Sequence, residues 1–247
     1  MTRACPPLAP PPPLSLLLDQ GRVALFLDFD GTLVDIADAP DGVTVAPRLP
    51  ERLERLGARL GGALALVTGR SIDNLTDFLG EPDLHLAGSH GGDVRAPGGA
   101  ILREGQALPQ PVAAALERFA ADRGLLYERK AHGGALHYRT QPEREDETRQ
   151  FALELSQAHG LVAKTGKCVV ELAWPGSDKG GAVDLLAARP PFAGALPIFI
   201  GDDVTDEDGF VACARLGGFG IAVGERVSAA ATHGLGSVEE VHKWLEL

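Results

Sequence analysis

The chain has 247 residues, of which 45% are hydrophobic and 23% charged, so it can bury a sizeable core as one large domain or two small ones. Its 23 Lys and Arg stand against 34 Asp and Glu, and the resulting formal charge of -11 argues against a nucleic-acid partner. A membrane-spanning protein is excluded as well, because no apolar run approaches the roughly 18 to 20 residues that cross a bilayer.

The N-terminus and the cysteines carry little functional information. Prolines interrupt the opening segment "MTRACPPLAPPPPLSLLLDQ", and we expect residues 1–20 to form a disordered, proline-rich leader rather than a signal peptide. Cys5, Cys168 and Cys213 are odd in number and lack the CxxC spacing of a metal site. Reduced thiols in a cytoplasmic protein are therefore expected.

Three nearly continuous apolar runs predict strands that are buried on both faces of a parallel sheet. They cover residues 23–29, 63–67 and 196–200. Helical patterns of apolar residues alternate with these runs, over residues 49–60, 72–79, 179–188 and 206–214. Strands alternating with helices predict an α/β fold with right-handed crossovers.

The middle of the chain has a different pattern, an αββαββ order that is typical of helices packed on one face of an antiparallel sheet. Its expected elements are residues 111–122, 125–131, 135–139, 143–159, 161–165 and 167–173. We expect this part to be an inserted cap domain, with "APGGA" and "WPG" as candidate hinges. The predicted division is a core of residues 21–107 and 177–247 with a cap of residues 108–176.

Polar residues follow each of the three predicted strands, and the carboxyl ends of such strands are where open α/β sheets bind ligands. Asp28 and Asp30 are two residues apart and can face one pocket, where two carboxylates repel unless a cation such as Mg²⁺ resolves them. A simple turn is the alternative for this "DG" pair. Asp202 directly follows the third strand and is a candidate for the same pocket. For the neighbouring Glu207 and Asp208, the main explanation is an acidic helix start, where the helix dipole favours negative charge.

Lys179 occupies the first turn of a predicted helix, where the helix dipole disfavours a cation. Gly180 and Gly181 follow it, which suggests an anion nearby, although a solvated lysine is the alternative. Thr68 adds a hydroxyl at the second strand end. Together, carboxylates, a hydroxyl and a lysine at strand ends predict a phosphoryl-transfer site with a nucleophile, a metal and donors for the transferring oxygens.

The segments "DFDGT", "TGR", "SDKGG" and "GDDVTDED" resemble, in this order, the four motifs of the haloacid dehalogenase superfamily of phosphatases. The resemblance implies a Rossmann-like three-layer core with a parallel sheet and an inserted α+β cap. It also implies that Asp28 is the nucleophile and Asp30 the general acid and base, while Thr68 and Lys179 hold the phosphoryl group.

The same resemblance implies an Mg²⁺ site. Its ligands would be Asp28, Asp202 and the main-chain carbonyl of Asp30, and Asp203 and Asp206 would orient the metal shell.

Further segments resemble the trehalose-6-phosphate phosphatases of this superfamily, namely "GSHGGDVR", "ERK", "LHYR", "GKCVVELAWPGSDKGGA" and "DDVTDEDGF". Asp93 departs from the family, where a glutamate is expected. The resemblance implies hydrolysis of trehalose 6-phosphate through an aspartyl phosphate, the last step of trehalose biosynthesis. The substrate-binding residues expected from it are Gly69, Arg70, His90, Asp93, Arg95, Lys130, His137, Arg139, Lys167 and Glu171.

Other readings remain open for the substrate and the class. A sucrose-phosphate or mannosylphosphoglycerate phosphatase would carry the same core motifs, and only cap residues separate these enzymes. A phospho-receiver signalling domain also gathers acids, a threonine and a lysine, but the long insert and Asp30 argue against it. A non-catalytic binding relative is a third alternative. The cap histidines and charges can equally be structural or solvated. We expect a monomer that binds a small sugar phosphate and neither nucleic acid nor membrane.

Overall fold

The computed structural model describes residues 8–37, 42–166 and 168–247. The chain forms two compact units, which are considered separately here. The core unit comprises the residues up to Arg103 together with Asp178–Leu247, and the inserted unit is Glu104–Ser177. These boundaries differ by a few residues from the division expected from the sequence. "APGGA" does not mark the hinge, because Ala96 N donates to Ala100 O across a turn inside the core unit.

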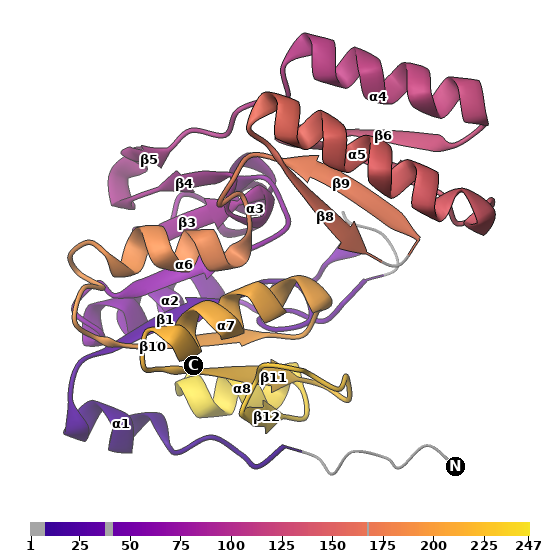
Figure 1. Ribbon diagram of the computed structural model, residues 1–247. Coiled ribbons are helices and arrows are strands. Elements are labelled where there is room, and N and C mark those ends of the chain that lie inside the picture. The colour runs from indigo at the N-terminus through magenta and orange to yellow at the C-terminus, as the bar shows by residue number, and fades with distance from the viewer. Residues whose placement is uncertain (1–7, 38–41, 167) are drawn as a thin grey trace, which may run out of the picture. The chain divides into compact units, whose positions relative to one another are not determined.

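The core unit contains an eight-stranded sheet in the order β12-β11-β10-β1-β2-β3-β4-β5 (Figure 1). The strands are β1 (Val23–Leu27), β2 (Leu64–Val67), β3 (His85–Gly88), β4 (Asp93–Arg95), β5 (Ile101–Arg103), β10 (Leu196–Gly201), β11 (Phe219–Val223) and β12 (His233–Leu235). β1 lies between β10 and β2 and runs parallel to both. Only β4 and β5 add antiparallel pairs at one edge. Every residue of β1 and β2 is buried, as their continuous apolar sequence predicts.

Helices cover this sheet and complete the predicted α/β fold. They are α1 (Leu14–Gln20), α2 (Leu49–Arg59), α3 (Ile72–Leu79), α6 (Lys179–Ala187), α7 (Glu207–Arg215) and α8 (Val238–Leu245), with short 3₁₀ turns η2 (Ser89–Gly91), η3 (Pro97–Gly99) and η5 (Val204–Asp206). Leu53, Leu75, Leu186 and Phe210 bring α2, α3, α6 and α7 into one hydrophobic cluster with β1. Among the described residues, no helix is both long and apolar enough to cross a membrane.

The N-terminal segment is ordered from residue 8 onward, and the expectation of a disordered leader is wrong for residues 8–20. Leu14 and Leu17 of α1 are buried in the core cluster. Proline lacks the main-chain N–H donor but keeps its carbonyl acceptor, so the proline-rich residues before α1 can still accept hydrogen bonds. Trp244 Nε1 donates to Pro12 O over 2.8 Å, and Gly234 N donates to Ala9 O over 3.0 Å. Residues 1–7 of the expected leader lie outside the described residues.

The inserted unit has the predicted αββαββ order and its own hydrophobic core. Its antiparallel sheet has the order β6-β7-β9-β8. The elements are α4 (Gln110–Arg123), β6 (Leu126–Lys130), β7 (Gly133–His137), η4 (Pro142–Arg144), α5 (Glu145–His159), β8 (Val162–Gly166) and β9 (Val169–Ala173). Leu116 of α4 and Ala152 of α5 pack with Leu136 and Val170 of the sheet. The opposite sheet face is therefore the one on which polar side chains can gather.

Candidate active site

Three strand ends meet at one edge of the core sheet and bring acidic residues together. Asp28 follows β1, and its N–H donates to Ile200 O of the neighbouring β10 over 2.9 Å. Asp202 follows β10, and Asp206 closes the 3₁₀ turn η5. Carboxylate oxygens of Asp28, Asp202 and Asp206 all lie within 4.8 Å of one another. The structure therefore places a compact, three-carboxylate cluster where the sequence predicts the site.

Two glycines make room for this cluster. Gly31 has a positive φ of 70°, and a Cβ on it would lie 2.2 Å from a carboxylate oxygen of Asp202. A Cβ on Gly201 would lie 2.2 Å from the carboxyl carbon of Asp206. Any side chain at either position would displace an acid from the cluster. Gly31 of "DGT" therefore allows the close approach of the Asp202 carboxylate in addition to forming a turn.

Lys179 is buried among these acids, with 2% of its side chain exposed, which rules out a solvated lysine. Its Nζ lies 3.0 Å from Asp28 Oδ1 and 2.6 Å from Asp206 Oδ1. Asp178 caps α6 by accepting a hydrogen bond from Gly181 N over 2.6 Å. A Cβ on Gly180 would lie 2.6 Å from Asp208 O, so this glycine allows α6 and α7 to approach closely.

The electrostatics of the cluster favour a bound cation. Burial raises the pKa of Asp28 to about 8, although Lys179 opposes this shift. Burial and the neighbouring Asp206 and Asp203 raise the pKa of Asp202 to about 6. Burial alone would lower the pKa of Lys179, but the carboxylates of Asp28 and Asp206 raise it, so the amine stays protonated. Burial disfavours the ionised carboxylates and one ammonium compensates them only in part, so a cation would stabilise their ionised forms, and the all-oxygen donor set fits Mg²⁺.

Asp30 and Arg70 form a bidentate ion pair. Arg70 Nε lies 2.7 Å from Asp30 Oδ2, and its Nη2 lies 2.7 Å from Asp30 Oδ1. Arg70 Nη1 donates to Asn74 Oδ1 over 2.8 Å, and the guanidinium lies 4.9 Å from the ring centroid of Phe78. The pair with Arg70, a predicted substrate-binding residue, holds the side chain of Asp30 in a fixed orientation.

Thr68 lies at the end of β2 with its side chain buried. Its hydroxyl accepts a hydrogen bond from Arg70 N over 3.2 Å, and its carbonyl accepts one from His90 N over 2.9 Å. The ring of His90 lies over Gly69, since a Cβ there would be 2.8 Å from His90 Cε1. Thr68, Gly69 and His90 therefore form one contiguous group beside β2.

Asp93 and Arg95 are two residues apart on β4, and they form an ion pair of 2.8 Å with each other. Arg95 also lies 3.5 Å from Asp73.

Asp203 is engaged in a capping box with Asp206, whose Oδ2 accepts a hydrogen bond from Asp203 N over 2.8 Å. Of the residues predicted to bind metal, Asp28, Asp202 and Asp206 therefore form the cluster, whereas Asp30 and Asp203 have other side-chain partners.

The inserted unit presents a charged face on the side of its sheet away from its helices. Lys130 Nζ lies 2.5 Å from Glu171 Oε2, and His137 Nε2 lies 2.9 Å from Glu128 Oε2. Strand alternation places all four on the face opposite Leu136 and Val170. Arg139 is exposed. Lys167 lies outside the described residues.

Sequence reasoning missed one further residue near the cluster. Arg226 follows β11, and its Nε donates to the main-chain oxygen of Asp202 over 2.9 Å. No motif marks this arginine in the sequence, because its partners are carbonyls of a loop more than 20 residues away.

The core unit is an α/β fold with three carboxylates and a buried lysine gathered at its strand ends. A solved haloacid dehalogenase-like hydrolase from B. subtilis shares the fold, with a TM-score of 0.67 and 15% identity, over 91% of this chain and 100% of that one. At such identity the likeness shows the fold alone.

The family model described as trehalose-phosphatase matches residues 26–237, so the chain belongs to the trehalose-phosphatase family of phosphoric monoester hydrolases. A probable trehalose-phosphate phosphatase of Sinorhizobium fredii is 40% identical over 232 residues, which cover 91% of this chain and 85% of the relative. The solved trehalose-6-phosphate phosphatase of Aspergillus fumigatus has a TM-score of 0.76 and 26% identity, over 96% of this chain and 98% of that one.

Proposed function

We propose that this chain is an Mg²⁺-dependent phosphatase that hydrolyses trehalose 6-phosphate to trehalose and phosphate, the last step of trehalose biosynthesis. The observation that carries the proposal is the buried contact of Lys179 with Asp28 and Asp206 at the end of the central strand. The names of the relatives, which match over nearly the whole chain, supply the substrate.

The first step is attack by a carboxylate oxygen of Asp28 on phosphorus. The new bond joins Asp28 to phosphorus, and the bond from phosphorus to the sugar oxygen breaks. Asp30 donates its proton to that departing oxygen, because an alkoxide is a poor leaving group. Lys179 stays cationic and offsets charge on the phosphoryl oxygens, and the hydroxyl of Thr68 can donate to one of them.

The second step returns the enzyme to its starting state. Asp30 takes a proton from water, the water oxygen bonds to phosphorus, and the bond to Asp28 breaks to release phosphate. The bidentate pair with Arg70 suits the carboxylate form of Asp30, which is the base of this second step.

Mg²⁺ would be held by Asp28 and Asp202 with the main-chain oxygen of Asp30, and Asp206 would complete or orient the ligand set. Bound there, it would neutralise charge on the carboxylates and on the phosphoryl oxygens. Without a cation, the pKa of about 8 would leave much of Asp28 protonated and unable to attack at neutral pH.

We assign sugar recognition to the charged face of the inserted unit. Glu171, Lys130 and His137 lie on one face of its sheet and supply hydrogen-bond donors and acceptors that suit hydroxyl groups. The specific preference for trehalose over other sugars is assigned to these residues. A monomeric state and a cytoplasmic location stay predictions.

The proposal is tested by Asp28→Asn, which keeps the shape of the side chain and removes the nucleophile. We expect release of phosphate from trehalose 6-phosphate to fall by about 10³-fold or more. Asp19→Asn on α1 is the matched control and should keep the wild-type rate, since that side chain is exposed. A wild-type rate in the folded Asp28→Asn protein would disprove the assigned nucleophile.

A further inference from the structure

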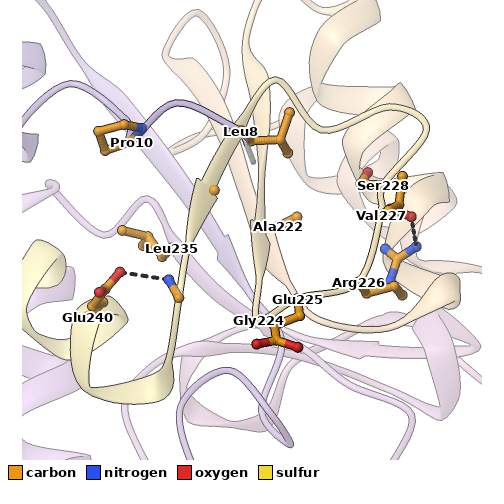
Figure 2. Close-up of a pocket in the computed structure, with 12 residues that line it drawn as sticks. Leu8, Pro10, Ala222, Gly224, Glu225, Arg226, Val227, Ser228, Leu235 and Glu240 are labelled. Atoms are coloured by element: carbon orange, nitrogen blue, oxygen red, sulfur yellow. Dashed lines mark hydrogen bonds between the residues drawn. The ribbon is translucent and has the colours of Figure 1, made fainter. Parts of the chain in front are cut away.

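Arg226 links two loops at the carboxyl edge of the core sheet. It follows β11, and its guanidinium donates from Nε to Asp202 O over 2.9 Å and from Nη2 to Asp203 O over 3.0 Å. Nη2 also lies 2.7 Å from Glu207 Oε1. Figure 2 shows Arg226, Val227 and Ser228 on one wall of a cavity of about 350 Å³, with Arg226 bonded to Val227 O. One side chain therefore contacts three residues of the acidic segment 202–207.

Glu207 extends this link back to the segment after β11. As the first residue of α7, it accepts hydrogen bonds from Ala230 N over 2.9 Å and from Ala229 N over 3.2 Å. Arg226 and Glu207 thus cross-link residues 226–230 to residues 202–207 in both directions. The side chain of Arg226 is 26% exposed and that of Glu207 is 20% exposed, so the pair is partly shielded from water.

The atoms that Arg226 contacts on Asp202 and Asp203 are main-chain oxygens. The carboxylate of Asp202 instead lies in the cluster with Asp28 and Asp206. Arg226 therefore fixes the backbone that carries this carboxylate without occupying the oxygens that would bind a cation. Loss of a group that orients metal ligands typically lowers metal affinity or activity by about 10- to 100-fold.

We propose that Arg226 is a positioning residue for the metal site, which it serves by holding the backbone of Asp202 and Asp203 in place. This inference rests on the proposed Mg²⁺ site. A purely electrostatic role has the opposite consequence, because a nearby guanidinium repels a divalent cation. Removing the charge would then tighten Mg²⁺ binding, whereas losing the positional support would weaken it. The direction of the change in affinity separates the two roles.

The test is calorimetric titration of Mg²⁺ into full-length, metal-free protein, with no substrate present. We expect Arg226→Gln to raise the dissociation constant about 10- to 100-fold, as the loss of orienting partners does at other metal sites. Arg226→Lys keeps the charge but lacks the planar guanidinium fork that donates to both carbonyls, and should also weaken binding. The matched control is Arg215→Gln, whose arginine pairs with the exposed Asp184 and should leave the affinity unchanged.

A second measurement keeps the inference testable if Arg226→Gln folds poorly. Glu207→Gln removes the charged partner of Arg226 and should loosen the link between residues 226–230 and residues 202–207. Amide hydrogen exchange in residues 201–208 should become faster in either variant relative to wild type. Unchanged or tighter binding by folded Arg226→Gln would overturn the inference alone. Wild-type protein that binds no Mg²⁺ would overturn both the inference and the metal dependence of the proposed function.

Discussion

At the residue scale, the acids of the cluster are buried at a cost to stability. The pKa of Asp202 in the folded protein is about 6, against an ordinary value of 3.8. A folded state that binds a proton more tightly than the unfolded state loses stability as the pH rises between these two values. Above about pH 6 the metal-free protein therefore carries the full penalty of the ionised Asp202. The proposed role of Asp202 as a metal ligand would explain why the chain keeps a carboxylate that lowers the stability of the metal-free protein.

This argument predicts that Asp202→Asn stabilises the metal-free protein. In thermal unfolding at about pH 8 we expect a higher melting temperature for the variant than for wild type, because the uncompensated charge is gone. The difference should shrink as the pH falls from about 6 toward 3.8, below which Asp202 is protonated in both states.

Mg²⁺ supplies the control for this prediction. It should raise the melting temperature of wild-type protein and have little effect on Asp202→Asn, which lacks a ligand. A metal-free variant less stable than wild type at the higher pH would contradict the cost assigned to Asp202.

All three acids of the cluster and Lys179 could be named from the sequence, but few of their partners could. Asp28, Lys179 and Asp202 could be found because strand ends and a helix start predict where chemistry is placed. The pairing of Arg70 with Asp30 could not be found, since it depends on backbone placement of residues 40 apart. The same holds for Arg226, whose partners are carbonyls that carry no sequence information.

At the element scale, the buried strands and the αββαββ order were predictable because continuous or periodic apolar patterns record which faces are buried. Strands β3, β4, β5, β11 and β12 and helix α8 were not predicted; β4, β5 and β12 have three residues each and are too short to show a period. The N-terminal helix α1 was missed because the prolines before it dominate the composition. Those prolines end where α1 begins, with Pro13 as the residue before its first turn.

The order of α1 predicts different effects of two leucines that are two positions apart. Leu14 is 1% exposed and Leu16 is 47% exposed. In urea unfolding, Leu14→Ala should lower the free energy of unfolding by about 2 to 4 kcal/mol through the lost burial and the cavity left behind. Leu16→Ala on the same helix should change it by less than about 0.5 kcal/mol. Equal, small effects at both positions would mean that α1 does not pack on the core.

At the scale of the whole molecule, the chain forms two units with separate hydrophobic cores, and each unit is assigned a different part of the proposed function. The core unit contains all the residues assigned to phosphoryl transfer. The inserted unit contains the face on which Glu171 pairs with Lys130. Such a division predicts that changes in the inserted unit alter the choice of substrate and leave the reaction itself intact.

Glu171→Ala tests this division. We expect kcat/KM for trehalose 6-phosphate to fall about 10-fold or more, as the loss of a sugar hydrogen bond to a charged group implies. Hydrolysis of p-nitrophenyl phosphate and the affinity for Mg²⁺ should stay within about twofold of wild type, since neither uses a sugar contact. Glu154→Ala, at an exposed position of α5, is the matched control. An equal loss on both substrates would count against a sugar contact by Glu171.

The central claim, an Mg²⁺-dependent phosphatase selective for trehalose 6-phosphate, is tested most directly by phosphate release from a panel of sugar phosphates. The panel contains trehalose 6-phosphate, glucose 6-phosphate and sucrose 6-phosphate, each with Mg²⁺ and with chelator. We predict release from trehalose 6-phosphate at least about 10²-fold faster than from the other two, and loss of all release with chelator. Equal rates on trehalose and glucose 6-phosphates would contradict the substrate, and full activity with chelator would contradict the metal.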